Sequence, residues 1–361
     1  MRISFLGDIL VYEQQNKWSR IGPNKYDYTD YLELVKPLLK DSDYVVGSLE
    51  TPLAGKRAKY TYEDVSFNTP DDILSTLKDI GVNMLTTGNN HALDRGIDGL
   101  LRTIRVLKRY GFDYTGTNES PSDKRYVIKE IEGVKIAFLS YTYGTNSAYN
   151  EHILAKDEEY LVNLTKRQEL PPNRSFVKRL ALKVFPLLPK KLRNIIRPVS
   201  VTRVIEDCVE DFEIANVANQ KYIDDLKNTI KEARRESDIV IFCLHSGGQF
   251  NNKVSGYTKW LIDLIVSFGV NAVICNHTHT VLPIEWARNG CLVAYSLGNF
   301  AFTPKTGCYV DNVGAEYSKI LHLEIDSSNK SIIDFSTSDC VSIVDESGRT
   351  RVMPTIGNVD I

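Results

Sequence analysis

Short apolar runs and longer amphipathic runs alternate along the chain. The apolar runs, rich in β-branched residues, predict strands at residues 2–6, 44–48, 82–87, 134–141, 238–244, 270–275 and 291–297. The longer runs, with apolar residues at helical spacing, predict helices at residues 28–42, 71–81, 96–111, 219–237 and 257–269. We expect Pro37 to bend the first helix and Gly111 to cap the third. Strands that alternate with helices indicate an α/β fold.

The pattern changes near the C-terminus, where strand-like runs follow one another without helices between them. Residues 316–350 predict consecutive strands, with residues 327–331 as a hairpin turn. These strands form either a second sheet or an antiparallel extension of the first. We interpret them as a C-terminal β extension of a single domain that spans residues 1–361.

Residues 171–203 interrupt the α/β pattern and are interpreted as an insertion. The segment contains nine Lys or Arg residues, no Asp or Glu, and many apolar residues. It is either a solvent-exposed basic segment that leaves the fold or an element that docks onto another surface. Over residues 174–203 an amphipathic basic segment would suit an anionic membrane surface.

Composition narrows the class of protein. The chain has 361 residues, 42% hydrophobic residues and a net charge of −2, so it has enough apolar residues for a sizeable core and is not expected to bind nucleic acid. Its six cysteines form no Cys-x-x-Cys pair and are expected to be reduced, buried thiols. Without a signal-peptide or membrane-span pattern, we expect a cytoplasmic protein, with peripheral membrane association if the basic segment docks.

Polar side chains stand at the ends of six predicted strands. They are Asp8, Glu50, Asn90 with His91, His245, His277 with His279, and Asn299. Ligands bind at the carboxyl ends of the strands in an open α/β sheet. These side chains are therefore expected to meet at one site.

This set of side chains suits a metal site. It holds four of the six histidines, and its donors are oxygen and nitrogen without sulfur, which fits one or two Mn, Fe or Zn ions. The alternative is that each residue is a locally satisfied cap or turn residue. His152 and His322 follow no such pattern and are expected to be structural.

Eight sequence blocks resemble the CapA family of capsule-biosynthesis (poly-γ-glutamate) proteins, within the calcineurin-like metallophosphoesterase superfamily. The blocks are FLGDIL, GSLETPL, NMLTTGNNHALDRGIDGLLRTI, GFDYTGTN, IAFLSYTYGTN, DIVIFCLHSGGQF, VICNHTHTVLPIE and AYSLGNFAF. They occur in family order within residues 1–302. The resemblance implies a metallophosphatase-like four-layer α-β-β-α sandwich with two mixed sheets.

The resemblance also implies roles for single residues. One metal ion would be bound by Asp8 and His279, the other by Asn90, His245 and His277, and Glu50 would bridge them. His91 would protonate the leaving group, steadied by Asp94. Further candidates for binding an anionic substrate are Arg95, Gly247, Gly248 and Asn299, the glycines through backbone N–H groups.

The chain departs from the family pattern at several positions. Leu10 stands where many superfamily members have a histidine, which predicts that the half-site of Asp8 and His279 binds metal more weakly. Ser246, Gln249 and Asn276 also differ from the residues usual at their positions. These departures concern the surroundings of the substrate more than the metal ligands.

We expect a CapA-like metal-dependent hydrolase, a phosphoesterase of capsule, exopolymer or cell-envelope metabolism. One alternative is a non-catalytic component of a poly-γ-glutamate synthesis complex. Another is a metal-dependent amide hydrolase that acts on γ-glutamyl-type peptides. The expected partners are an anionic small-molecule or polymer substrate and envelope or capsule synthesis proteins.

Overall fold

The computed structural model describes residues 1–62, 66–171, 220–306 and 313–355. Apart from its first residue, the predicted basic insertion at 171–203 lies outside these ranges. Its membrane-docking role and the expectation of one domain over residues 1–361 therefore stay predictions. Within the described ranges, no helix is both long enough and apolar enough to span a membrane.

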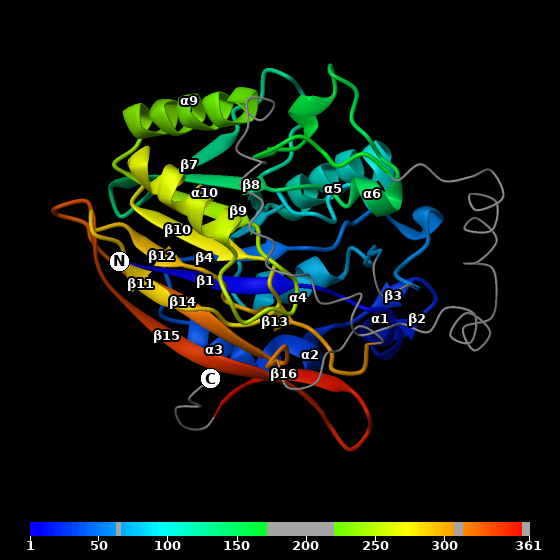
Figure 1. The fold of residues 1–361 in the computed structure, drawn as a ribbon. Coiled ribbons are helices and arrows are strands. Elements are labelled where there is room, and N and C mark those ends of the chain that lie inside the picture. Colours follow the sequence, from blue (N-terminus) through cyan, green and yellow to red (C-terminus); the bar gives the residue numbers. More distant parts are fainter. Residues whose placement is uncertain (63–65, 172–219, 307–312, 356–361) are drawn as a thin grey trace.

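The first sheet is mixed and has eight strands (Figure 1). Five of them run parallel: β1 (Arg2–Ile9), β4 (Tyr44–Leu49), β5 (Met84–Thr86), β6 (Asp113–Thr115) and β13 (Asn299–Ala301). Each of the other three pairs antiparallel with its neighbour: β14 (Tyr317–Asp326) with β1, β15 (Ser331–Val344) with β14, and β16 (Thr350–Pro354) with β15. The C-terminal strands therefore extend the first sheet from the edge of β1, and do not form a sheet of their own.

The second sheet is also mixed and has six strands. The parallel strands are β8 (Val134–Thr142), β9 (Ile239–His245), β10 (Ala272–Asn276) and β12 (Leu292–Ala294). Antiparallel strands form its two edges: β7 (Tyr126–Ile131) and β11 (Ile284–Trp286). A separate small hairpin joins β2 (Arg20–Gly22) and β3 (Lys25–Tyr26).

Helices cover the outer faces of the two sheets. The longer ones are α4 (Ile73–Asp79), α5 (Gly96–Tyr110), α9 (Gln220–Glu236) and α10 (Gly256–Ser267). The shorter ones are α1 (Glu13–Trp18), α2 (Thr29–Leu32), α3 (Lys36–Leu39) and α6 (Ser147–Asn150), with 3-10 turns η1 (Glu33–Val35), η2 (Lys56–Ala58) and η3 (Glu159–Leu161). Figure 1 shows α9 and α10 on the second sheet, with α2 and α3 on the far side of the molecule.

Buried apolar side chains define the layers. Between the sheets, Phe5 of β1 packs against Phe138 of β8, with ring centroids 6.5 Å apart. A second cluster joins α4 to the outer face of the first sheet, through Leu77 and Leu85. A third joins α9 and α10 to the second sheet, and Ile230 is one of its members. The predicted four-layer α-β-β-α sandwich with two mixed sheets is confirmed.

The predicted 28–42 helix is broken where proline interrupts it. Pro37 has no N–H, and its ring clashes with the carbonyl four residues earlier, so an α-helix cannot run through it undisturbed. The chain instead forms α2, the 3-10 turn η1 and then α3. By contrast, the predicted 96–111 helix forms as α5, and Gly111 caps it in the left-handed conformation at φ 71°.

The strand β1 continues past its predicted end and carries a register irregularity between Phe5 and Asp8. Gly7 lies there because a Cβ at this position would fall 2.0 Å from the carbonyl oxygen of Gly298. The close approach allows Asp8 N–H to donate to Gly298 O at 2.9 Å and lets β13 pair with the end of β1. Asp8 is thereby fixed within a strand rather than in the loop after it.

Candidate metal centre

The six residues predicted to bind metal gather where parallel strands of both sheets end. Asp8 lies near the end of β1 and His245 is the last residue of β9. The others lie just beyond strand ends: Glu50 after β4, Asn90 after β5, and His277 and His279 after β10. All six are buried, with at most 4% of their surface exposed. The structure thus brings together side chains from both sheets and from distant parts of the chain.

One group of donors converges on His245. Its Nε2 lies 2.8 Å from Asn90 Oδ1, 3.1 Å from Glu50 Oε1 and 3.1 Å from His277 Nδ1. The one N–H that His245 Nε2 can carry cannot form hydrogen bonds with all three of these atoms. Ligand atoms about 2.0–2.2 Å from a tetrahedral Zn²⁺ lie about 3.3–3.6 Å apart. A slight expansion of the group would therefore make room for a divalent ion.

The second group of donors is looser. Asp8 Oδ2 lies 3.7 Å from His279 Nδ1, and Glu50 Oε2 lies 4.0 Å from the same nitrogen. Asp8 is held in place by a hydrogen bond from Ser48 Oγ at 2.9 Å and one from the backbone N–H of His277 at 3.1 Å. The weaker binding expected of this half-site stays a prediction.

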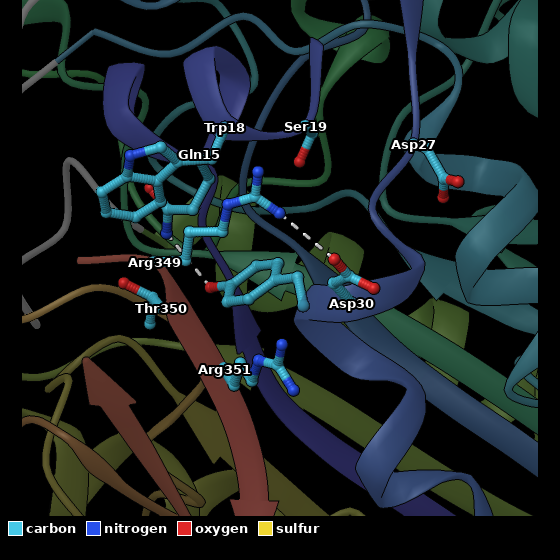
Figure 2. Close-up of a pocket in the computed structure, with 9 residues that line it drawn as sticks. Gln15, Trp18, Ser19, Asp27, Asp30, Arg349, Thr350 and Arg351 are labelled. Carbon is cyan, nitrogen blue, oxygen red and sulfur yellow. Dashed lines mark hydrogen bonds and ion pairs between the residues drawn. The ribbon is translucent and has the colours of Figure 1, made fainter. Parts of the chain in front are cut away.

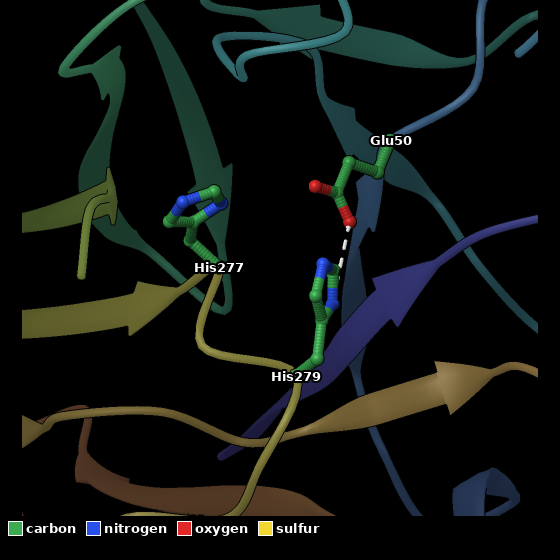
Figure 3. A group of neighbouring side chains, drawn as sticks. All are labelled: Glu50, His277 and His279. Atoms are coloured by element: carbon green, nitrogen blue, oxygen red, sulfur yellow. Dashed lines mark ion pairs between the residues drawn. The ribbon is translucent and has the colours of Figure 1, made fainter. Parts of the chain in front are cut away.

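Among the described residues, two sets of side chains have ligand atoms close enough together to hold an ion. Glu50 belongs to both. These sets are Glu50 with His277 and His279, and Glu50 with Asp8 and His245. Figure 3 shows the Glu50 carboxylate and the His279 imidazole turned toward each other, with His277 beside them. The sets divide the histidines differently from the two predicted half-sites. Because Glu50 is common to both, it has the position of a bridging ligand.

The ionisation of the cluster shows that a cation suits it. Desolvation raises the pKa of Asp8 to about 7, and desolvation followed by repulsion from Asp8 raises the pKa of Glu50 well above its ordinary value. Desolvation also lowers the pKa of His245 and His279 well below the ordinary value. Within the described residues, neither oxygen of Glu50 accepts a hydrogen bond. Buried carboxylates beside neutral imidazoles are the donors that a divalent metal ion requires.

The loop between His277 and His279 holds a strained backbone. The φ angles are 117° at His277 and 58° at His279, in the region that L residues rarely adopt. Such conformations cost on the order of 1–3 kcal/mol each and persist where the surroundings enforce them. Here the carboxylate of Asp8 binds His277 N–H, and Phe250 N–H binds Thr278 O at 2.7 Å. Strain of this kind is typical of functional sites.

His91 lies beside the metal centre and contacts Asp94 as its spacing predicts. Its Nδ1 lies 2.8 Å from Asp94 Oδ2, which also accepts from Phe67 N–H at 2.7 Å. The Phe67 ring packs edge-on against the imidazole, with centroids 4.6 Å apart. The other nitrogen, Nε2, lies 3.9 Å from Glu50 Oε1. His91 therefore presents Nε2 to the metal centre, while its catalytic role stays a prediction.

The contacts of Arg95 point to a structural role. Its guanidinium donates to the backbone oxygens of Ala58 at 3.0 Å and of Asp94 at 2.9 Å, and also to Ser66 Oγ. These bonds tie the loop that begins at η2 to the turn that carries His91. The predicted binding of an anionic substrate by Arg95 stays untested, and these contacts do not favour it.

Asn299 contacts the loop that carries His279, and its predicted binding of an anionic substrate stays a prediction. Its Nδ2 donates to the backbone oxygens of His279 and Ala315, at 3.1 and 2.9 Å. Its Oδ1 therefore faces His279 Nδ1, at 2.9 Å, and can only accept. His279 accordingly carries its proton on Nδ1, which leaves a lone pair on Nε2.

The glycine pair lies directly after His245 and Ser246. Gly247 has φ 139°, and a Cβ there would lie 2.6 Å from Thr278 Cγ2, so only glycine fits without a shift. Among the described residues, the N–H groups of Gly247 and Gly248 donate no hydrogen bond. They are available to an anion, and their binding of one stays a prediction.

Ser48 and Phe67 are among the neighbours of the site that were not identified from the sequence. Ser48 holds Asp8, and Phe67 packs on His91. A hydroxyl within an otherwise apolar strand was a usable signal for Ser48. For Phe67 no local signal exists, because its loop reaches the site only through long-range packing. Leu10 is buried among aromatic side chains, so this position supplies no ligand.

A small cavity lies between α1 and β16 (Figure 2), and none of the predicted site residues lines it. Its volume is about 30 Å³. It is lined by Gln15, Trp18, Ser19, Asp27, Asp30, Tyr31, Arg349, Thr350 and Arg351. Arg349 is already paired with Asp30 at 3.3 Å. A space of this size holds about one water molecule, so it is not the candidate functional site.

Comparison with known proteins gives one family match. The family model of the bacterial capsule synthesis protein PGA_cap matches residues 2–304, which include every predicted site residue. The PGA biosynthesis protein CapA of Bacillus subtilis (strain 168) is 24% identical over 304 residues, 83% of this chain and 62% of that protein. The capsule biosynthesis protein CapA of Bacillus anthracis is 25% identical over 307 residues, 84% of this chain and 60% of that protein.

The chain thus spans less than two thirds of the length of these two relatives. Among solved structures, a hypothetical protein from Thermus thermophilus is 13% identical, with a TM-score of 0.46. That alignment covers 94% of this chain and 98% of the other.

Proposed function

Because the chain belongs to the bacterial capsule synthesis protein family PGA_cap, we propose that it is a metal-dependent hydrolase of capsule, exopolymer or cell-envelope metabolism, and specifically a phosphoesterase. The observation that carries this proposal is the pairing of His91 with Asp94 beside a buried cluster of metal-binding side chains. A metal site that is only structural has no need of such a pair.

The residues divide into those that hold metal and those that move a proton. Asp8, Glu50 and the histidines after β9 and β10 would hold the ions, with Asn90 contributing its amide oxygen. Metal ions held there would supply Lewis-acid activation of a phosphoester and of water. The oxygen and nitrogen donors suit Mn, Fe or Zn.

In this proposal His91 is the general acid. Its Nδ1 is engaged by the Asp94 carboxylate, so an imidazolium ring would be paired and held in one orientation. Its Nε2 then holds a proton on the side of Glu50, where a leaving group at the metal centre would need it. The Phe67 ring keeps the imidazole from rotating away.

A second candidate function is that of a non-catalytic component of a polymer-synthesis complex. The names of the two CapA relatives favour it, since both describe biosynthesis proteins and neither describes a hydrolase. The third candidate, an amide hydrolase on γ-glutamyl-type peptides, would use the same metal-binding residues and the same proton donor.

One set of measurements separates the three candidates. The purified full chain is analysed for Mn, Fe and Zn, then assayed on aryl phosphate monoesters and diesters and on γ-glutamyl peptides. Metal together with phosphoester hydrolysis that a chelator abolishes supports the proposal. Cleavage of peptides alone favours the amide hydrolase, and bound metal with neither activity favours the non-catalytic role. A chain that takes up no divalent metal would refute the metal site.

A further inference from the structure

The loop that follows β8 reaches the metal centre through Asn146. Its side-chain Oδ1 accepts a hydrogen bond from Asn90 Nδ2 at 3.3 Å, and its Nδ2 lies 3.4 Å from His91 Nδ1. Asn90 and His91 come from the first sheet, whereas Asn146 follows a strand of the second. Asn146 therefore contacts both a predicted metal ligand and the predicted general acid from the opposite side of the site.

The bond to Asn90 decides which end of the Asn90 amide faces the histidines. An amide oxygen can only accept, so the NH₂ group of Asn90 must point to Asn146 Oδ1. The oxygen of Asn90 then points to His245 Nε2, at 2.8 Å. Only the amide oxygen has a lone pair for a metal ion, and a flipped amide would present N–H groups instead.

The contact with His91 is secondary. His91 Nδ1 is held by Asp94 Oδ2 at 2.8 Å, which is much shorter than its 3.4 Å separation from Asn146 Nδ2. Since Nδ1 donates its proton to the carboxylate, it has no lone pair for the amide of Asn146. The effect of Asn146 is therefore expected at Asn90 rather than at the proton donor.

The backbone explains why an asparagine fits at this position. Asn146 has φ 52° and ψ 26°, the left-handed conformation that Asn and Gly adopt at lowest cost. Its carbonyl oxygen accepts from Tyr149 N–H at 2.8 Å and Asn150 N–H at 2.9 Å. Asn150 Nδ2 also donates to Thr145 O at 2.7 Å. Because these bonds do not involve the side chain of Asn146, glycine can replace it without unseating the loop.

We propose that Asn146 is a positioning residue for metal binding, which orients the amide oxygen of Asn90 toward the ion held with His245 and His277. This inference rests on the metal site of the proposed function but not on hydrolysis. Residues that orient metal ligands in this way typically contribute about 10–100-fold to metal affinity. The sequence predicted no role for Asn146, which the structure adds to the surroundings of the site.

The test is calorimetric titration of the metal-free full chain with Mn²⁺, using three variants. Asn146→Gly keeps the left-handed backbone and removes the amide, so the affinity of the His245 half-site should fall about 10–100-fold, with the other half-site unchanged. Asn146→Asp keeps an oxygen that accepts from Asn90, so it should bind as tightly as the wild type or more tightly. Asn150→Ala loosens the same loop without touching the site and should match the wild type.

Thermal unfolding of each metal-free variant shows whether the loop change alters the fold. Wild-type affinities for both ions in Asn146→Gly would overturn the inference. An equal loss of Mn²⁺ affinity in Asn150→Ala would also overturn it, because the loss would then come from loosening of the loop and not from the missing amide. A wild-type chain that takes up no Mn²⁺, Fe²⁺ or Zn²⁺ would refute the metal site of the proposed function, and with it the role of Asn146.

Discussion

At the scale of single residues, the side chain that contacts Nδ1 of a histidine decides whether that histidine is suited to donate a proton or to bind a metal ion. His91 and His279 each have Nδ1 beside a side-chain oxygen, Asp94 Oδ2 at 2.8 Å and Asn299 Oδ1 at 2.9 Å. A carboxylate can pair with a charged imidazolium, whereas a neutral amide provides no opposite charge. Burial also lowers the pKa of His279 well below its ordinary value. His279 is thus suited to bind metal and His91 to carry a proton.

The role of His91 gives a direct prediction. In His91→Ala the metal content should match that of the wild type, because the ligand atoms around Glu50 are unchanged. Turnover of an aryl phosphate should fall about 10²–10⁴-fold, the usual contribution of a general acid. His152→Ala, which removes an exposed imidazole, is the matched control and should keep normal turnover. Loss of metal from His91→Ala would instead make His91 a ligand.

The unequal sets of donors predict unequal metal affinities. Three donors lie within 3.1 Å of His245 Nε2, whereas beside Asp8 and His279 the buried Leu10 supplies no ligand. Titration of the metal-free chain should therefore show a tight site and a weaker one. His245→Ala should abolish the tight site, and His279→Ala should affect mainly the weaker one. Two equal, tight sites in the wild type would contradict this interpretation.

At the scale of elements, β14 is tied to both of its neighbours by a buried histidine. Ser4 Oγ of β1 lies 2.7 Å from His322 Nδ1, and Ser338 Oγ of β15 lies 2.9 Å from Nε2. Hydroxyl groups can each donate or accept, so both nitrogens of a neutral ring are satisfied. Burial lowers the pKa of His322 below its ordinary value. This matches the structural role expected for His322.

This lowered pKa predicts how stability depends on pH. The unfolded chain takes up a proton at His322 more readily than the folded one, so the contribution of His322 is present above its unfolded pKa and lost as pH falls through the folded pKa. The free energy of unfolding of His322→Gln should therefore be below that of the wild type near pH 8, with a gap that narrows toward pH 5. Urea unfolding of the metal-free proteins at several pH values measures this. A gap that is independent of pH would exclude the linkage.

At the scale of the whole molecule, the metal centre lies across the two sheets. Asp8, Glu50 and Asn90 lie on or after strands of the first sheet, and the ligand histidines lie on or after strands of the second. Buried carboxylates without a cation oppose folding, because their charges are desolvated. A bound ion therefore joins the sheets as well as serving the site.

Metal removal should accordingly lower the stability of the entire fold. At a free metal concentration about 100 times the Kd, binding to the folded state adds about 2.7 kcal/mol. A chelator should lower Tm, and added Mn²⁺ or Zn²⁺ should restore it. His91→Ala should show the same shift as the wild type, and His245→Ala a smaller one. A Tm that is insensitive to chelator would mean that the ligand side chains hold no metal.

Local patterns in the sequence predicted a large part of the fold and of the site. The 96–111 helix with Gly111 as its cap, the parallel strands of the second sheet and the polar residues at strand ends follow from neighbouring residues. Short strands such as β6 and β13 were not predicted, because three residues carry too little periodicity. The break at Pro37 was underestimated as a bend, since proline both removes a donor and clashes with the preceding turn.

The sequence by itself determined which residues are available for metal chemistry and on which elements they lie, because periodicity and turn chemistry are properties of adjacent residues. Only the tertiary structure decided that the C-terminal strands extend the first sheet, that Asn299 holds His279 and that Asn146 faces Asn90. These outcomes depend on pairing between distant segments. Which segments pair depends on which strand edges and side-chain donors still lack hydrogen-bond partners once the layers have packed.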